Sequence, residues 1–265
     1  MNYDIIASLI FNMENIQIQP LIDIAKDAGD AILNIYHNSD FSSIVDFKSD
    51  DSPLTLADKD SHVVIMAALE KLYPEVPIIS EEGSQVDYGV RKVWETFWLV
   101  DPLDGTKEFI KKNGEFTVNI ALIHKGKPIM GVVYSPVQDI YYCGDSNGAF
   151  KIAGGIKSTL HVNNKEAKEI AVRSKSHPSP EEEVVLQRYG IADSISVGSS
   201  LKFCMVADGK ADIYYRHGPT MEWDTAAGQA VVEAAGGKIY KGNTEDVLFT
   251  YNKESLLNGS FLCIG

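Results

Sequence analysis

Length, composition and charge restrict what this chain can be. It has 265 residues, of which 45% are hydrophobic and 23% are charged, as in an ordinary globular protein. This excludes a collagen, a coiled coil and a wholly disordered chain. The 24 Lys and Arg against 37 Asp and Glu give a net charge of −13. Because so acidic a surface repels phosphate backbones, we expect no nucleic-acid partner.

The cysteines and the N-terminal residues indicate the compartment. Cys143, Cys204 and Cys263 are odd in number and form no C-x-x-C pair, which disfavours a disulfide framework and a cysteine zinc site. This pattern predicts a reducing, cytoplasmic environment. The N-terminal apolar run has no basic residues before it, so no signal peptide is expected. Residues 1–12 are interpreted as an extension, since Met13 could also begin the folded part.

Hydrophobic periodicity and turn residues predict helices and strands in the first half. Pro20 suits a first helical turn, and the apolar residues after it recur with a 3.6-residue period, so a helix is expected over 21–35. A polar loop is expected over 40–53, followed by a helix over 56–72 that Thr55 caps. Strands are expected at 76–80, 97–100, 118–124, 129–134, 140–143, 149–152 and 170–173.

The second half is predicted to alternate in the same way. Helices are expected at 180–189, 201–208 and 224–235, the last ending at Gly236-Gly237. Strands are expected at 211–215, 238–240 and 261–264. A seam within 151–168 gives two predicted halves, 13–155 and 156–265. The mixture of elements predicts a layered α/β or α+β architecture.

The segment Trp98–Thr106 carries the most informative pattern. An apolar strand there is expected to end at Asp101 and Asp104, two carboxylates three residues apart, in a turn shaped by proline and glycine. Like charges avoid one another unless a cation lies between them, and carboxylate oxygens suit Mg²⁺. Gly105 and Thr106 offer an N–H and a hydroxyl to a phosphate oxygen. Spacing alone leaves open an acidic turn that only caps the next helix.

Three other acidic positions add to this pattern, although each has an ordinary explanation when taken alone. Glu81 and Glu82 follow an apolar strand but also fit a solvated turn. Asp224 stands at a helix start, where capping is the usual role of aspartate. Asp58 lies on an early helical turn, where acidic residues are common.

Other phosphatase, hydrolase and nucleotide motifs do not fit. The chain has no G-x-S-x-G, P-loop or G-x-G-x-x-G sequence, and its six histidines show no metal-ligand spacing. Haloacid-dehalogenase-type phosphatases carry Asp-x-Asp-Gly-Thr, with the acids two apart. Here the acids are three apart and Pro102 follows Asp101, which places the first acid badly for a nucleophile.

Taken together, the acidic segments resemble the inositol monophosphatase superfamily of metal-dependent, lithium-sensitive phosphatases. The matching segments, in family order, are Glu81-Glu82, Asp-Pro-Leu-Asp-Gly-Thr at 101–106, and Trp223-Asp224 with the helix ending at Gly236-Gly237. Within the superfamily the chain is most similar to the 3′(2′),5′-bisphosphate nucleotidase branch, on the segments 104–109, 113–119, 198–204 and 218–220. The resemblance implies an α+β fold, a layered α-β-α-β-α sandwich with its metal site between the halves.

The resemblance also implies roles for single residues. Two to three Mg²⁺ ions would be held by Glu81, Asp101, the carbonyl of Leu103, Asp104 and Asp224. Glu81 and Thr106 would orient the attacking water, with support from Asp58. The implied substrate-binding residues are Glu81, Leu103, Asp104, Gly105, Thr106, Ser176, His177, Ser199, Lys202 and Asp224.

The implied reaction is Mg²⁺-dependent hydrolysis of the 3′-phosphate of 3′-phosphoadenosine 5′-phosphate to AMP and phosphate, in support of sulfur assimilation. A phosphatase for inositol phosphate or another sugar phosphate, and a non-catalytic metabolite-binding protein, are the alternatives. A second phosphate needs local cations, and Lys202 is the expected donor, with Arg173, Lys175 and Arg216 as further candidates. The resemblance leaves open a homodimer and peripheral contact with the inner face of the membrane.

Overall fold

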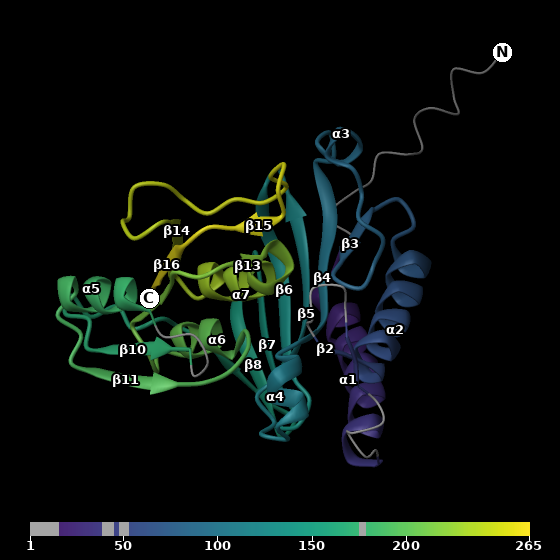
Figure 1. Ribbon diagram of the computed structural model, residues 1–265, viewed down its shortest axis with the longest axis horizontal. Helices are drawn as coiled ribbons and strands as arrows, with labels where there is room; N and C mark the ends of the chain where they lie inside the picture. Colours follow the sequence, from purple (N-terminus) through teal and green to yellow (C-terminus); the bar gives the residue numbers. More distant parts are fainter. Residues whose placement is uncertain (1–15, 39–44, 48–52, 175–178) are drawn as a thin grey trace.

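The computed structural model describes residues 16–38, 45–47, 53–174 and 179–265. Its main elements form five layers, which follow one another across Figure 1. They are helices α1 (Ile18–Asn38) and α2 (Leu56–Leu72), a seven-stranded sheet, helices α6 (Leu201–Ala207) and α7 (Glu222–Ala234), a five-stranded sheet, and helix α5 (Pro180–Arg188). This arrangement confirms the predicted α-β-α-β-α sandwich.

The seven-stranded sheet is buried on both faces along its central strands. Trp98 and Val100 pack with α1 and α2, while Phe97 and Leu99 pack with α7. Its first two strands are parallel and the rest are antiparallel. In order across the sheet, the strands are β3 (Ile78–Ser80), β4 (Thr96–Asp104), β5 (Thr117–His124), β6 (Lys127–Ser135), β7 (Ile140–Asp145), β8 (Gly148–Ala153) and β9 (Ile156–Thr159).

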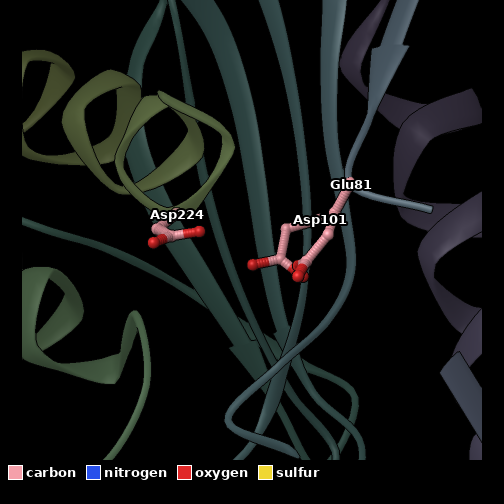
Figure 2. A group of neighbouring side chains, drawn as sticks. All are labelled: Glu81, Asp101 and Asp224. Atoms are coloured by element: carbon pink, nitrogen blue, oxygen red, sulfur yellow. The ribbon is translucent and has the colours of Figure 1, made fainter. Parts of the chain in front are cut away.

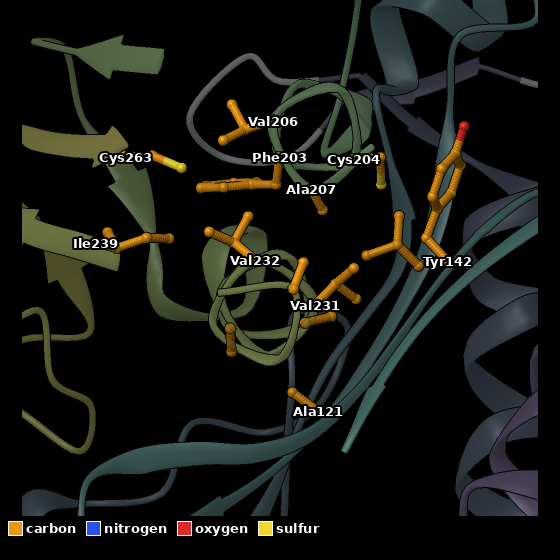
Figure 3. Packing of buried hydrophobic residues seen from close by; sticks show 14 of the residues in the cluster. Ala121, Tyr142, Phe203, Cys204, Val206, Ala207, Val231, Val232, Ile239 and Cys263 are labelled. Carbon is orange, nitrogen blue, oxygen red and sulfur yellow. The ribbon is translucent and has the colours of Figure 1, made fainter. Parts of the chain in front are cut away.

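The five-stranded sheet closes the other side of the α6–α7 layer. Phe203 and Val232 lie between the two sheets, with Tyr142 of the large sheet on one side and Ile239 and Cys263 of the small sheet on the other (Figure 3). Because one apolar core spans both sheets, the two halves pack as one unit. The strand order is β11 (Asp193–Ser196), β10 (Ile170–Arg173), β12 (Ile213–Arg216), β16 (Phe261–Ile264) and β14 (Lys238–Lys241).

Helix α7 lies unusually close to β6 and β7. A Cβ added to Gly131 would lie 2.7 Å from the carbonyl oxygen of Ala227, and one added to Gly144 would lie 2.6 Å from that of Ala230. Both separations are shorter than carbon atoms tolerate, so only glycine fits at these positions. The glycines therefore set the height of α7 above the sheet, and α7 carries Asp224 in its first turn.

The structure confirms the predicted long helices and strands, and it corrects the end of one strand and the segments that were predicted to be loops. Strand β4 does not end before Asp101 but continues to Asp104, because its backbone still pairs with β5 there. The predicted loop over 40–53 contains the short strand β1 (Val45–Phe47) and the start of β2 (Pro53–Thr55). The other elements that were not predicted are also short: α3 (Tyr88–Arg91), α4 (Thr106–Ile110), β9, β11, β13 (Thr220–Met221) and β15 (Leu257–Asn258).

Two predictions about how the chain is divided are not confirmed. The division after residue 155 would separate β8 from β9, which pair in one sheet, and the division stays a prediction. The proposed extension at 1–12 and Met13 lie outside the described residues. None of the helices described by the structure has the length and hydrophobicity needed to cross a membrane.

Candidate metal centre and substrate pocket

The first two acids of the site are brought together by parallel strands. In the register of β3 and β4, Ser80 lies beside Val100, and the amide of Glu81 donates to the carbonyl of Val100 at 3.1 Å. The residues that follow these two, Glu81 and Asp101, therefore emerge side by side. Because β3 and β4 are parallel, Glu81 and Asp101 lie together at one edge of the sheet although they are far apart in the sequence.

The turn after Asp101 is shaped by an irregularity in the β4–β5 pairing. The register shifts between Asp101 and Asp104, and the amide of Leu103 donates to Oδ1 of Asp101 at 3.2 Å. From helix α2, the hydroxyl of Ser61 donates to the carbonyl of Pro102 at 2.8 Å. The first bond holds the Asp101 carboxylate, and the second holds the backbone of the turn that follows it.

Gly105 ends the turn in the left-handed region, with φ +94°, and the short helix α4 begins directly after it at Thr106. A Cβ at Gly105 would lie 3.2 Å from the carbonyl oxygen of Glu115. Both conformation and space therefore favour glycine there. The predicted neighbours Gly105 and Thr106 thus lie immediately beside the acidic residues of β4.

Asp224 comes from the opposite half of the molecule, on the first turn of α7. Its Oδ2 accepts a hydrogen bond from the amide of Met221 at 2.8 Å, so Asp224 is not the N-cap itself but the third helical residue, whose side chain bonds back to the N-cap Met221. The same carboxylate also extends toward Glu81 and Asp101, as Figure 2 shows. The capping explanation and the metal-ligand prediction are therefore compatible in one side chain.

Glu81, Asp101 and Asp224 form one group, in which one carboxylate oxygen from each lies within 4.8 Å of the others (Figure 2). Asp101 is only 1% exposed. Burial raises the pKa of Asp101, and the charges of Glu81, Asp104, Asp224 and Asp58 raise it further. Burial followed by the charge of Asp104 likewise raises the pKa of Asp224.

A divalent cation fits this donor set. The raised pKa values of Asp101 and Asp224 mean that their acidic neighbours repel them, and Asp101 is buried away from the water that would screen this repulsion. A cation between them would remove that cost, and hard oxygen donors in a small group match Mg²⁺. Three of the four predicted carboxylate ligands therefore meet in an arrangement that can hold metal.

Asp104, the fourth predicted carboxylate, lies next to this group but makes other contacts. Its Oδ2 accepts from the amide of Ser200 at 2.6 Å, from the hydroxyl of Ser199 at 2.7 Å and from that of Ser200 at 2.8 Å. Behind them, Asn119 donates to Ser200 at 3.0 Å, and Thr117 lies 2.6 Å from the Ser199 hydroxyl. These contacts tie β5 to the start of α6, and the role of Asp104 as a metal ligand stays a prediction.

A pocket of about 150 Å³ opens between the halves beside the acids. The residues that line it include Asp104 and Asp224, the cations Lys202 and Arg216, and Tyr214. Lys202 is 7% exposed, and its ammonium donates to the carbonyl of Ser199 at 2.6 Å. Burial lowers the pKa of Lys202 to about 8, against the attraction of Asp104. The pocket thus contains both carboxylates and a buried cation.

The other predicted residues lie near the acidic group or outside the described residues. Asp58, on the first turn of α2, is 1% exposed and close enough for its charge to raise the pKa of Asp101. Leu103 is buried within the turn. Ser176 and His177, and with them Lys175, lie outside the described residues.

Sequence reasoning missed the polar residues that support the site. Ser200, Asn119 and Thr117 surround Asp104, yet they come from segments far apart in the chain. Ser200 could have been suspected because it follows the predicted Ser199. Asn119 and Thr117 lie in the segment 113–119 that carries the resemblance, but no role was predicted for them, because each looks like a polar residue in a buried strand.

Comparison with known proteins agrees with this geometry. A model of the inositol monophosphatase family matches residues 15–262. The 3′(2′),5′-bisphosphate nucleotidase CysQ of Escherichia coli strain K12 is 47% identical over 238 residues, covering 90% of this chain and 95% of that protein. The protein of the same name from Buchnera aphidicola is 40% identical over 254 residues, covering 95% of both chains.

Solved structures extend the comparison to the fold. The crystal structure of CysQ from Bacteroides thetaiotaomicron is similar with a TM-score of 0.81 and 44% identity, over 93% of this chain and 96% of that one. The suppressor protein SuhB of Bartonella henselae has a TM-score of 0.74 at 23% identity, over 93% and 92% of the chains, and shares the fold. On the family match, the relatives and the acidic site together, this chain belongs to the inositol monophosphatase family.

Proposed function

We propose that this chain is a 3′(2′),5′-bisphosphate nucleotidase that hydrolyses the 3′-phosphate of 3′-phosphoadenosine 5′-phosphate to AMP and phosphate. The observation that carries the proposal is the pocket that joins Asp104 and Asp224 to the buried Lys202. A substrate with two phosphates needs a metal-binding end for one and a separate cation for the other. Two relatives named as this nucleotidase are 47% and 40% identical over most of the chain.

We propose Mg²⁺ as the cofactor, with two to three ions. The residues that would hold them are Glu81, Asp101, the carbonyl of Leu103, Asp104 and Asp224. When bound, Mg²⁺ supplies a Lewis acid that activates water and neutralises charge on phosphate oxygens. The fit rests on the three carboxylates within 4.8 Å and on the burial of Asp101.

The chain's own residues would position the reactants. Glu81 and Thr106 are proposed to orient the attacking water, with Asp58 behind them. Gly105 and Thr106 would hold the phosphate, since they follow the acidic turn directly. Water would attack phosphorus in line as the bond to the ribose 3′ oxygen breaks, so no covalent enzyme intermediate is required.

Lys202 is the proposed partner of the second phosphate. Its side chain lines the pocket, and at neutral pH a pKa of about 8 leaves most molecules cationic. Ser199 lies beside it and also contacts Asp104. Arg216 lines the same pocket and adds positive charge. Ser176 and His177 remain predicted nucleotide contacts.

Phosphate release from a panel of substrates tests the proposal. In the presence of Mg²⁺, 3′-phosphoadenosine 5′-phosphate should give the highest kcat/KM, ahead of AMP and inositol monophosphate. Removal of the metal with a chelator should abolish release from every substrate. A preference for inositol monophosphate would favour a sugar-phosphate phosphatase, and no release from any of them would favour a metabolite-binding protein.

Lithium should inhibit the enzyme selectively. Li⁺ resembles Mg²⁺ in size but carries half its charge, so it can enter a site of crowded carboxylates without replacing the catalytic charge. We expect turnover at fixed Mg²⁺ and fixed ionic strength to fall with LiCl but not with equal KCl. Equal responses to the two salts would mean that only ionic strength acts, and would contradict the proposed exchange.

Location and assembly stay proposals as well. The three cysteines are buried and free, which suits a reducing cytoplasm. Peripheral contact with the inner face of the membrane and a homodimer are implied by the sequence resemblance.

A further inference from the structure

A buried carboxylate stands close to Asp224 but outside the acidic group. Glu222, the first residue of α7, is fully buried, with 0% of its surface exposed. Its Oε2 accepts from the amide of Asn252 at 2.8 Å, and its Oε1 accepts from the amide and the ammonium of Lys253 at 3.0 and 2.6 Å. The start of α7 is therefore attached to residues 252–254, which we call the 252–254 segment.

The 252–254 segment is held from its other side by Arg91, which is 3% exposed and ends α3 in the stretch of chain that follows Glu81. The Arg91 guanidinium donates to Asn252 Oδ1 at 2.9 Å, to the carbonyl of Lys253 at 2.7 Å and to that of Glu254 at 2.8 Å. Asn252 returns a bond from its amide group to the carbonyl of Arg91 at 2.8 Å. One charged side chain from each half of the molecule thus grips the same short segment.

The contacts continue from this segment to the Asp224 carboxylate. The Lys253 ammonium donates to Asn258 Oδ1 at 2.9 Å, and the Asn258 amide donates to the carbonyl of Met221 at 2.7 Å. The amide of Met221 then donates to Asp224 Oδ2 at 2.8 Å. Glu222 also stands only two residues before Asp224 in the first turn of α7.

This arrangement is a poor way to gain stability alone. Burying a charge costs desolvation energy, and apolar residues of similar volume often stabilise a fold as well as a buried ion pair does. The charged pairs do restrict how the paired groups are oriented, because a guanidinium group and a carboxylate form hydrogen bonds only in a narrow range of geometries. That property suits a site in which three carboxylates from two halves must be held at fixed separations.

We propose that Glu222 and Arg91 are positioning residues, which act through the 252–254 segment to hold Asp224 against Glu81 and Asp101 and so set the affinity for the divalent cation. This inference rests on the proposed function, since it requires that the three carboxylates bind Mg²⁺. Neither residue contacts the substrate or the metal in this scheme. Their effect is on where the Asp224 carboxylate stands.

The test is Mg²⁺ titrated by calorimetry into the full-length protein without substrate. Glu222→Gln keeps the size of the side chain and removes the charge that fixes Lys253. We expect its Kd for Mg²⁺ to rise roughly 10- to 100-fold, the usual effect of losing a residue that orients a metal ligand. The Mg²⁺ concentration that gives half-maximal turnover should rise in parallel, while turnover recovers at saturating Mg²⁺.

The matched control is Asp208→Asn. Asp208 pairs with Lys151 at 2.8 Å and also joins the two halves, but at the far end of α6. Asp208→Asn should lower Tm and leave the Mg²⁺ Kd unchanged. If Glu222→Gln lowers Tm in the same way with a wild-type Kd, the role of Glu222 is structural and the inference is overturned.

A second variant guards against failure of Glu222→Gln to fold. Arg91→Lys keeps the positive charge but cannot reach all three acceptors, so it should weaken Mg²⁺ binding in the same direction and by a smaller factor. A wild-type Kd in folded Arg91→Lys would count against the role of Arg91. If the wild-type protein itself shows no Mg²⁺ binding, the proposed metal site fails first and the positioning role fails with it.

Discussion

Asp101→Asn should lose roughly 10²- to 10³-fold in Mg²⁺-dependent kcat and still fold normally, by analogy with the loss of one preorganised hydrogen-bonding group from an active site. Asn matches Asp in size, so the buried turn at 1% exposure keeps its packing. It removes the central carboxylate of the acidic group, with which Glu81 and Asp224 would hold the metal. Steady-state kinetics with increasing Mg²⁺ measure the loss. Near-normal turnover in a folded Asp101→Asn protein would contradict the site assignment.

The pH dependence of stability provides an independent measurement on the same variant. The pKa of Asp101 is raised above its ordinary value of 3.8, so the folded, metal-free protein binds more protons than the unfolded chain above that pH. The free energy of unfolding should therefore fall as pH rises from about 4 toward the raised pKa. Asp101→Asn should flatten this fall in metal-free buffer, although the Asp224 carboxylate, raised in the same direction, keeps part of it.

Asp212→Asn is the matched control for removing a buried carboxylate. Asp212 is also 1% exposed, but it accepts hydrogen bonds from the Asn163 side chain at 2.6 Å and from the amides of Glu169 and Ile170 at 2.8 Å. Its loss should destabilise the fold, because those donors lose a charged acceptor. The dependence of turnover on Mg²⁺ should stay as in the wild type.

Lys202→Ala should reduce kcat/KM for 3′-phosphoadenosine 5′-phosphate by roughly 10- to 150-fold. A charge-assisted contact between an ammonium and a phosphate contributes about 1.5–3 kcal/mol, and each ~1.4 kcal/mol corresponds to a tenfold change. Hydrolysis of a monophosphate that lacks the second group should change little. The measurement is kcat/KM for both substrates on wild type and variant.

The controls for Lys202 separate charge recognition from folding. Its ammonium also donates to the carbonyl of Ser199, so a loose α6 start would affect both substrates alike. An equal loss on the two substrates would therefore assign Lys202 to the fold or the metal site. Lys210→Ala, at an exposed cation that pairs with Asp208 near the other end of α6, should leave both values unchanged.

The acidic group itself could be predicted from the sequence because its signal is local. An apolar run that stops at Glu81, and another that meets Asp101, show where each chain leaves the sheet, and the resemblance supplied Asp224. The periodicity of the residues after Pro20 was sufficient for α1, whose buried residues keep the expected spacing. Long elements with one buried stripe leave a clear pattern.

The supports of the site could not be predicted in this way. Asn119 reads as a polar residue in a buried strand, and its partner Ser200 lies in the other half of the chain. Glu222 and Arg91 look like ordinary charged residues in the sequence, and they are buried only because the 252–254 segment passes between them. Short edge strands such as β11, with the sequence Asp-Ser-Ile-Ser, have too few apolar residues to show the alternating pattern that predicts a strand.

The close seating of α7 has a consequence for how this sequence can change over generations. Gly131 and Gly144 take no part in any proposed chemical step, yet a single methyl group at either would push against the helix that holds Asp224. Exchanges among large core residues can be compensated by their neighbours, whereas nothing beside these two glycines can shrink to make room. A larger residue at Gly131 or Gly144 should therefore displace the helix and with it the Asp224 carboxylate, although neither glycine lines the pocket.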